Sequence, residues 1–572
     1  MFSRRRLAFI ISITIVFSVL FFLFNLDHDF LRSQVINIAD DFSTLDTISA
    51  PWVEGADDGF IIVGNPQSDS DKLIKANTID ALKQIKAEYI TVNQVESEEL
   101  NGNAILIFVS SDLSQVGDLE RIANHIKEGG RAIFAAGIPN ETYGRFFDPV
   151  WGILERGGFT TSSEMTFNEG FFPYDLITIN DAYTTYSMTL RLNDASEVLI
   201  QGENGNPLVW THAYNQGRIA MINGSFMESK LSSGILIASI NSTREQSLYP
   251  IQATKTVFLD AIPPLFDGND DRSFEYYGRS AESFVRDKLW AVLLQSASLH
   301  DLRLTSSFMA IDKQNFDSQN ANQQTFSYIS QEIIKNKGEI TLSGNHVDLG
   351  TLTEARVDQT KVFFEKFFPN YTIHSYYPLY GKISQDQIDL IQRVYPSIDI
   401  IRTLLQGDNK IQSSEDYILK DGTVIFPTMT YGYKAEGIQL YTFMSRLTSH
   451  GLVSHSFDIN SLFTVPTNES NWNTLNKTFD QLSDVYFSET PWLDAMTISP
   501  AAERLKAMIK LRVKTKTETD QMIVTCSDMT VGQKFLFYST KEINSIEGAS
   551  FERINARYYL IEAQTASFTI LY

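Results

Sequence analysis

Cysteine is almost missing from this chain, which has one, Cys526, among 572 residues. A single thiol excludes an internal disulfide framework, and the apolar strand QMIVTCSD around it predicts a core residue. Histidine is sparse as well: eight are present, and six of them show no metal-ligand spacing such as i, i+4. His346 and His455 stand apart, because each falls at the predicted C-terminal end of a strand.

Positive charge is also in short supply. The chain has 47 Lys and Arg residues against 69 Asp and Glu residues, which gives a net charge of −22. A field of this sign repels phosphate backbones, so we expect no nucleic-acid partner. It favours a cationic or neutral partner, although a simple role in solubility explains the charge equally well.

Long hydrophobic runs are absent, with one exception at the N-terminus. The run from Leu7 to Phe24 has 18 apolar or uncharged residues, and as a helix it would span about 27 Å, close to the thickness of the bilayer core. Arg4 to Arg6 precede it, while Asp27 and Asp29 follow it. This asymmetry predicts a cytoplasmic N-terminus and an extracellular bulk. A signal peptide would need a small-x-small cleavage site, which NLDHDF lacks, so we assign residues 1–26 to a single-pass anchor in the cell membrane.

The rest of the chain predicts an α/β protein of three units, preceded by a connector at residues 27–54. Residues 55–250 alternate strands such as GFIIVGNP, NAILIFVSSD and RAIFAAGIP with helical segments, a pattern typical of a parallel sheet. Residues 251–500 repeat the alternation over more elements, in the rhythm of a (β/α) barrel. Residues 501–572 contain short strands with no helix between them, which predicts a small β-sandwich.

The first unit resembles the class I glutamine amidotransferase fold, on the stretches GGRAIFAAG and QGRIAMINGSF. A true amidotransferase needs a cysteine nucleophile on a strand-to-helix elbow. Cys526 lies far away in the last unit, so the glutaminase chemistry is absent. The resemblance therefore implies an amidotransferase-like domain with a binding or scaffolding role.

The middle unit resembles the polysaccharide deacetylases, the NodB-homology barrel. The likeness rests on the order of four short stretches, TVFLDAIPP, GNHVDLG, YYPLYG and GLVSHSFD, none of which matches the family fully. Members of that family hold a divalent metal, usually zinc, with one Asp and two His. A second Asp acts as base on the metal-bound water and a late His acts as acid.

Carried onto this chain, the resemblance gives an incomplete set of residues. Asp260 matches the metal aspartate, but Leu259 stands where the base belongs. His346 matches the second metal histidine, and Leu342 stands four residues earlier where the first belongs. His455 matches the late acid. The resemblance thus implies a catalytic pair, Asp260 and His455, and a zinc site with only two of the usual three protein ligands.

Polar and aromatic residues near these motifs are candidates for a sugar groove. Exposed aromatic side chains can stack on sugar rings, although most aromatic residues belong to the core. The candidates for substrate contact are Tyr376, Tyr377, Tyr380, Trp492 and Asp348. Asp348 is also a candidate for the missing metal ligand, together with Asn345, Asp267 and Asp270.

Two functions remain open at this point. One is metal-dependent de-N-acetylation of an extracellular polysaccharide, and the other is a non-catalytic protein that binds the polymer or scaffolds its export complex. The order of the units resembles an uncharacterised bacterial family associated with Pel-type exopolysaccharide clusters. That resemblance implies partners among the synthase-complex proteins and an amino-sugar polymer. Deacetylation makes such a polymer cationic, and a chain of charge −22 would attract it.

Overall fold

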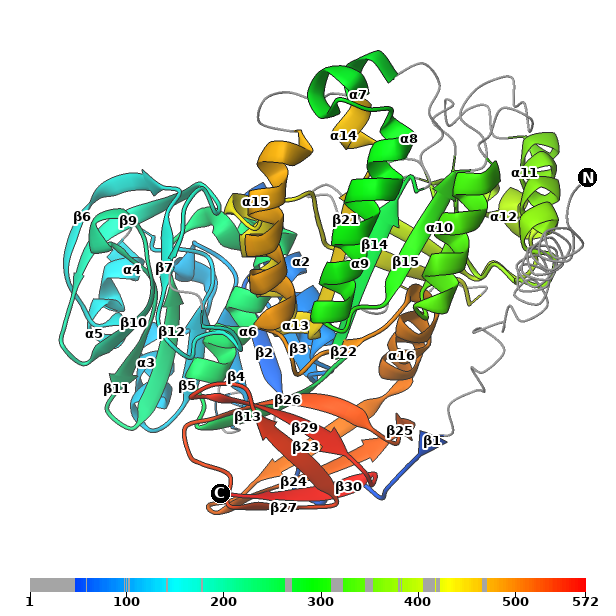
Figure 1. Cartoon of the computed structure of the whole chain (residues 1–572). Coiled ribbons are helices and arrows are strands. Elements are labelled where there is room, and N and C mark those ends of the chain that lie inside the picture. Colours follow the sequence, from blue (N-terminus) through cyan, green and yellow to red (C-terminus); the bar gives the residue numbers. More distant parts are fainter. Residues whose placement is uncertain are drawn as a thin grey trace, which may run out of the picture.

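The computed structural model describes residues 47–572, apart from 58, 97, 99, 101–102, 140–141, 176–177, 263–269, 310–322, 345–352, 379–380, 382, 405–416, 418–421 and 465–470. The predicted anchor at residues 1–26 and most of the connector lie outside this part of the chain. Within the described ranges, no helix has the length and apolar character needed to cross a membrane. Figure 1 shows three units, with the first α/β unit beside a barrel and a strand-rich C-terminal unit beneath them.

A mixed sheet of nine strands forms the first unit. Strand β2 reads Phe-Ile-Ile-Val and is buried along its whole length, as expected for a parallel strand covered on both faces. Helices α2 and α6 pack in one apolar cluster and α3 and α5 in another, so helices cover both faces. The parallel half contains β3 (Tyr89–Val92), β2 (Phe60–Val63), β4 (Ile105–Phe108), β5 (Arg131–Phe134) and β12 (Gly217–Ile222). The antiparallel half contains β11 (Pro207–Tyr214), β10 (Ser196–Gln201), β7 (Met165–Phe167) and β8 (Thr178–Ile179).

The helices of this unit and a separate ribbon complete it. The helices are α2 (Asp69–Gln84), α3 (Leu119–Lys127), α4 (Thr142–Phe146), α5 (Asp148–Trp151) and α6 (Ser233–Ser242). The ribbon consists of β6 (Ile153–Ser162) and β9 (Thr185–Leu192), which pair antiparallel. The parallel sheet predicted from the strand–helix alternation is therefore present, with an antiparallel extension.

Parallel strands form a nearly closed barrel in the second unit, as the sequence predicted. Their order around the wall is β19 (Val424–Thr428), β18 (Ile400–Leu404), β17 (Ser375–Tyr377), β16 (Glu339–Ser343), β15 (Leu304–Met309), β14 (Thr254–Asp260), β21 (Leu452–Asp458) and β20 (Thr430–Tyr431). A short strand β22 (Asp494–Ala495) also pairs with β14. The wall closes because β19 and β20 follow each other directly, and between them the amide of Met429 donates to the carbonyl of Ser454 at 2.9 Å.

Helices surround the barrel, and one of them closes its amino end (Figure 1). Residues of α16 share an apolar cluster with Phe258 and Leu452 of the wall. The buried carboxylate of Glu339 accepts hydrogen bonds from Ser499 N at 3.0 Å and Ser499 Oγ at 2.6 Å, at the start of that helix. The helices are α7 (Asp270–Tyr277), α8 (Ala281–Phe284), α9 (Trp290–Leu299), α10 (Gln323–Lys335), α11 (Glu354–Phe367), α12 (Gln385–Val394), α13 (Gly437–His450), α14 (Ser461–Thr464), α15 (Trp472–Ser483) and α16 (Ile498–Lys510).

The C-terminal unit contains two antiparallel sheets with a shared core. Cys526 is buried in that core, as the sequence predicted, and burial raises the pKa of its thiol to about 12. One sheet has the order β13 (Gln246–Ile251), β26 (Gln533–Ser539), β29 (Tyr558–Ala563) and β28 (Ala549–Arg553). The other has the order β23 (Arg512–Thr517), β24 (Gln521–Ser527), β30 (Ser567–Leu571) and β27 (Ser545–Glu547). A further pair joins β1 (Thr47–Ile48) to β25 (Met529–Thr530).

Strand β13 crosses the domain boundary that the sequence predicted at residue 250. That boundary groups the first residues of β13 with the α/β unit, but β13 pairs antiparallel with β26 from Gln246 to Ile251. The physical reason is that its hydrogen-bond partner comes from residues almost 300 positions later, which no local pattern reveals. The C-terminal unit is thus built from both sides of the barrel in the sequence.

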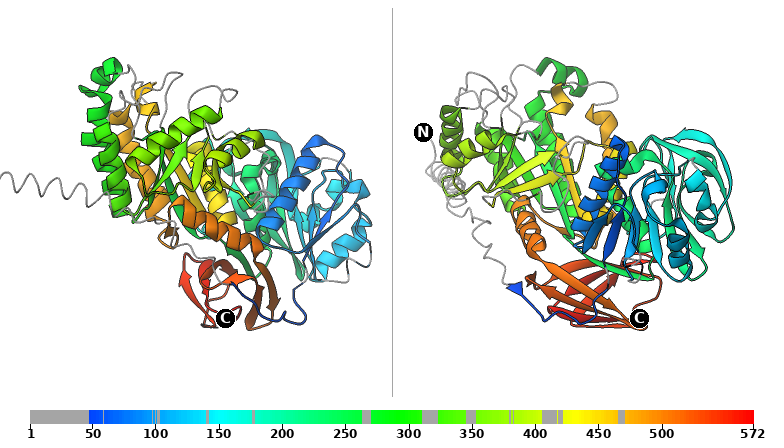
Figure 2. Two further views of the ribbon diagram at one scale, coloured as in Figure 1. Left: turned by 90° about the vertical axis from the view of Figure 1, so that its right-hand side faces the viewer. Right: turned by 180° about the vertical axis from the view of Figure 1, so that it is seen from behind.

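The first unit packs tightly on the barrel through α6 and α13. Gly234 has no side chain at the point of closest approach, where a Cβ atom would lie 2.2 Å from the carbonyl oxygen of Ser445. The amide of Gly234 donates to Ser445 Oγ at 2.9 Å, and Ser232 Oγ lies 2.6 Å from the hydroxyl of Tyr441. Figure 2 shows the α/β unit against the side of the barrel in both further views.

Candidate functional site

A buried ion pair lies at the carboxyl end of the barrel. Asp260, the last residue of β14, receives hydrogen bonds on both carboxylate oxygens from Nη2 of Arg402, each at 2.6 Å. Ser307 Oγ donates to Oδ1 at 2.8 Å, and Ser456 Oγ donates to Oδ2. Strands β14, β15, β18 and β21 thus each send one polar side chain to the same point inside the barrel.

Aromatic rings hold the Arg402 guanidinium in place. Its central carbon lies 3.5 Å from the ring centre of Tyr377 and 4.2 Å from that of Phe258. Arg402 is fully buried, and stacking between two rings suits the planar guanidinium. Tyr377 is a predicted groove residue, so the structure brings it together with Asp260. Burial, followed by the charge of Asp260, raises the pKa of Tyr377 to about 12.

A second carboxylate, Asp458, ends β21 beside Asp260. The two residues are register partners in neighbouring parallel strands. Asp458 keeps exposed surface, yet protein atoms crowd its carboxyl, and this desolvation, followed by the charge of Asp260, raises its pKa to about 6. A carboxyl with such a pKa can hold or release a proton near neutral pH.

His455 faces away from this group. Ser456 reaches Asp260 inside the barrel, and successive side chains of a strand point to opposite faces, so His455 points outward. There its ring packs edge-on against Phe457 and Tyr486, with centroid distances of 4.5 and 5.2 Å. The structure therefore does not bring His455 and Asp260, the predicted catalytic pair, together.

Hydrogen bonds fix the protonation of His455. Nε2 lies 2.9 Å from the carbonyl oxygen of Gly432, which can only accept, so Nε2 carries the proton. Nδ1 accepts from the hydroxyl of Thr430 at 2.9 Å. Burial lowers the pKa of His455 to about 3, so its ring is neutral at physiological pH.

The other predicted site residues divide into three groups. His346, Asp348 and Tyr380 lie outside the described residues, as do Asn345 and Asp267. Asp270 is the first residue of α7. Tyr376 and Trp492 are described and belong to the apolar core, where they are about 95% buried.

The described residues do not fit a zinc site. Each carboxylate oxygen of Asp260 already accepts two hydrogen bonds, and the guanidinium of Arg402 occupies the position beside it. A second cation there would meet a positive charge. Among the residues with described positions, no group of three His, Cys, Asp or Glu side chains could hold a metal ion. The zinc prediction consequently depends on His346.

Sequence reasoning missed Arg402, Ser307, Ser456 and Asp458. One signal could have found Arg402, because it is the single charged residue within the strand IIRTL. A buried charge in such a strand requires a buried partner of opposite sign. Asp458 lies in the quoted stretch GLVSHSFD, where the histidine match drew attention away from it.

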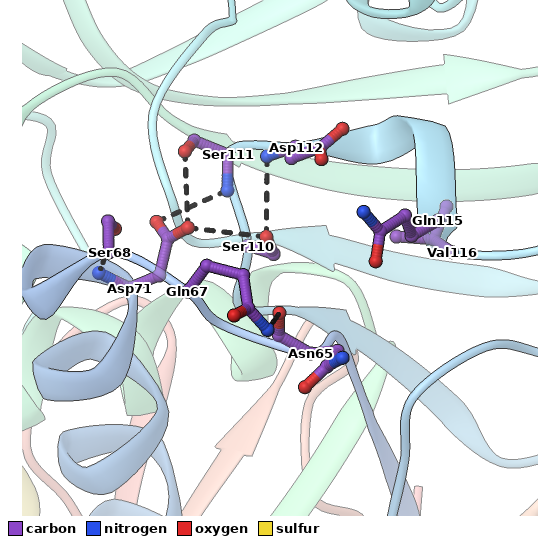
Figure 3. A pocket seen from close by; sticks show the side chains of 9 residues that line it. All are labelled: Asn65, Gln67, Ser68, Asp71, Ser110, Ser111, Asp112, Gln115 and Val116. Atoms are coloured by element: carbon purple, nitrogen blue, oxygen red, sulfur yellow. Dashed lines mark hydrogen bonds between the residues drawn. The ribbon is translucent and has the colours of Figure 1, made fainter.

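A second polar site lies in the first unit, at the carboxyl ends of β2 and β4. The strand order reverses between these strands, because β3 follows β2 on one side and β4 returns to the other. Ligands of open α/β sheets bind at such a reversal. Figure 3 shows the pocket there, with a volume of about 160 Å³. Buried Asp71 accepts from Ser110 Oγ, Ser111 N and Ser111 Oγ, each at 3.2 Å.

Comparison with known proteins places the chain in a family. The sequence profile of a family described as "Uncharacterised protein conserved in bacteria (DUF2194)" matches residues 150–560. This chain belongs to that family. No curated protein matches it.

Solved structures show which fold this member of the family adopts. The crystal structure of Agd3, described as a novel carbohydrate deacetylase, is similar over 91% of this chain and 99% of its own, with a TM-score of 0.56 and 10% identity. At that identity the likeness concerns the fold alone. The cold-adapted β-galactosidase from Rahnella sp. R3 matches 30% of each chain with 14% identity and a TM-score of 0.23, a likeness too weak to indicate a shared fold.

Proposed function

We propose that this protein acts on an exported polysaccharide, which it binds at the carboxyl end of the barrel. The observation that carries the proposal is the polar group formed there by Asp260, Arg402, Ser307 and Ser456, with the carboxyl of Asp458 beside it. Sites of (β/α) barrels are built at this end. The fold shared with a protein described as a carbohydrate deacetylase supports a carbohydrate ligand.

Binding is the function that the geometry favours. Asp260 is fully engaged by donors of the barrel itself, so it is held as a structural anion. Asp458 keeps exposed surface at the mouth and can meet a ligand. A carboxylate there would attract an amino group of a partly deacetylated sugar chain, and the net charge of −22 acts in the same direction.

De-N-acetylation is a second candidate, favoured by the raised pKa of Asp458. A carboxyl with a pKa of about 6 can exchange a proton with a substrate near neutral pH. In this scheme Asp458 moves the proton at the mouth, while Asp260 and Arg402 keep the neighbouring wall rigid. The predicted zinc ligand His346 remains a proposal that the experiment below includes, whereas the buried, outward-facing ring of His455 has no place in this scheme.

The cellular setting completes the proposal. Residues 1–26 anchor the chain in the membrane with the N-terminus in the cytoplasm and the barrel outside. The protein would then meet a Pel-type amino-sugar polymer as the synthase complex exports it. Support comes from the basic flank and apolar run at the N-terminus and from the acidic composition.

Two measurements on the same samples distinguish these functions, and the first is a binding titration. The full chain is titrated at low salt with a partly de-N-acetylated N-acetylglucosamine oligomer and with a neutral glucan oligomer. We expect the amino-sugar oligomer to bind more tightly than the glucan oligomer. Asp458→Asn should lower the affinity for the amino sugar by about tenfold, because one charge-assisted contact is lost. Glu552→Gln, which removes an exposed carboxylate of the C-terminal unit, should leave binding unchanged.

Acetate release from a fully acetylated oligomer is measured in the same samples, with divalent metals added in turn. Release that disappears in Asp458→Asn and His346→Ala, but not in Glu552→Gln, would establish the second candidate. Equal affinity for the amino sugar and the glucan, together with no acetate release, would refute both functions.

A further inference from the structure

A pocket with a volume of about 360 Å³ lies between the first unit and the C-terminal unit. Its walls come from the amino ends of β5 and β12, the turn after α6, and strands of the C-terminal unit. Figure 1 shows the C-terminal sheets lying directly beneath this edge of the first sheet. The pocket shares no lining residue with the barrel site.

Arginine side chains gather in this pocket although the chain as a whole is strongly acidic. Arg131 and Arg218 are register partners in the parallel strands β5 and β12, so two like charges start next to each other. Arg218 forms an ion pair with Glu197 at 2.8 Å. Arg131 forms no side-chain hydrogen bond or ion pair with any residue that the structure describes. Like charges placed side by side are destabilising unless an anion lies between them.

Two further guanidinium groups complete the cluster. Arg244 lies over the ring of Phe60 at 5.1 Å, and its buried Nε has no hydrogen-bond partner among the residues that the structure describes. Burial, followed by the charge of Arg131, lowers the pKa of Arg244 to about 10, and the charge of Asp57 opposes this shift only in part. Arg557 enters from the C-terminal unit, and its side chain also has no ion-pair partner within the described ranges. The Nε of Arg218 is likewise buried, with no hydrogen-bond partner in the described part of the chain.

The carboxylates of the pocket do not neutralise this charge. Glu197 is engaged by Arg218, and Glu245 lies 3.4 Å from Lys541. Glu169 is the third carboxylate in the lining. Among the described lining residues, three guanidinium groups therefore face one carboxylate that is not already paired, and Asp57, outside the lining, acts on Arg244. Buried donors without acceptors cost free energy, and an anion bound between the guanidinium groups would recover it.

We propose that this pocket binds a small molecule through its oxyanion group, a carboxylate or a phosphate. Arg131, Arg244 and Arg557 supply the charge, and the planar fork of each guanidinium matches two oxygens of such a group. The hydroxyl of Thr540 offers a neutral donor at the rim. The volume exceeds that of a bare ion and leaves room for a body about the size of one sugar ring. Because both units contribute arginines, the ligand would join them.

Calorimetric titration of the full chain tests the proposal, with inorganic phosphate, glucuronate and glucose as probes at low salt. We expect phosphate or glucuronate to bind and glucose not to bind, and binding by only one of the two anions identifies the group. Arg131→Gln and Arg244→Gln should each lower the affinity for the anion by about tenfold or more, which is the contribution of one charge-assisted hydrogen bond. Glu169→Gln should strengthen it, because a competing carboxylate is removed.

Matched measurements make the outcome decisive. Arg553→Gln removes an exposed arginine outside the pocket and should not change the affinity. Amino-sugar binding at the barrel mouth should survive Arg131→Gln, which also demonstrates that the variant is folded. The proposal is overturned if neither anion binds at about 10 mM, where any useful site would be occupied. An equal loss in Arg553→Gln would also overturn it.

Discussion

Arg402 donates from one nitrogen to both carboxylate oxygens of Asp260, a residue 142 positions earlier in the chain, at 2.6 Å each. The pair crosses the interior of the barrel and links β14 to β18. Neither side chain has more than a small exposed surface, with 0% for Arg402 and 9% for Asp260. Solvent therefore does little to screen the interaction.

Replacement of Arg402 by Met should destabilise the barrel strongly. The substitution leaves the carboxylate of Asp260 buried without its counter-charge, a change that costs about 3–5 kcal/mol. The double variant Arg402→Met with Asp260→Asn should recover part of that loss, since no uncompensated charge remains. Denaturant unfolding of the two single variants and the double variant measures the coupling. Strictly additive losses would contradict the direct ion pair.

Acid should destabilise the protein partly through His455. The folded-state pKa of about 3 lies below the unfolded value of about 6.5, so the unfolded chain binds the proton more readily. The free energy of unfolding then falls as the pH decreases from about 6.5 towards 3. His455→Gln removes this contribution and should flatten the dependence in that window. Unfolding free energies at a series of pH values measure it, and an unchanged slope in the variant would be evidence against a buried neutral ring.

Asp458 should make ligand binding at the barrel mouth depend on pH. Its folded-state pKa of about 6 lies above the unfolded value of about 3.9, so its contribution to stability decreases as the pH rises between these values. Over the upper part of this window the carboxyl gains its charge. Affinity for an N-trimethylated glucosamine oligomer, which stays cationic at every pH, should therefore rise through pH 6. Asp458→Asn should abolish the rise, and its persistence in that variant would assign the titration to another group.

Much of the fold follows from the sequence because local patterns report local structure. Strand–helix alternation predicted the parallel sheet and the barrel, and Asp260 lies at the strand end where the motif placed it. The sequence predicted the position of a side chain along a strand better than the direction in which it points. The match of His455 fixed its position along a strand, but a shift of one residue decides whether it faces the barrel interior or the helices outside.

The sequence did not predict which residues far apart in the chain become partners, for a different reason. Arg402 and Asp260 lie on strands from different parts of the barrel wall, and the residues of the whole barrel separate β13 from its partner β26 in the sequence. Motif positions indicate the residues that a known family would use. They do not indicate that Ser307 and Ser456 donate to the carboxylate of Asp260, on which the metal prediction depended.

The pairing of β1 with β25 sets the reach of the molecule from its proposed anchor. Thr47 and Ile48 are fixed to the C-terminal unit, while the proposed anchor ends at residue 26. The intervening segment, residues 27–46, can span at most about 70 Å when fully stretched. The C-terminal sheets would consequently be the part of the protein tied directly to the proposed anchor. The length of this tether would limit how far the barrel mouth can lie from the bilayer, and hence from a polymer that is being exported.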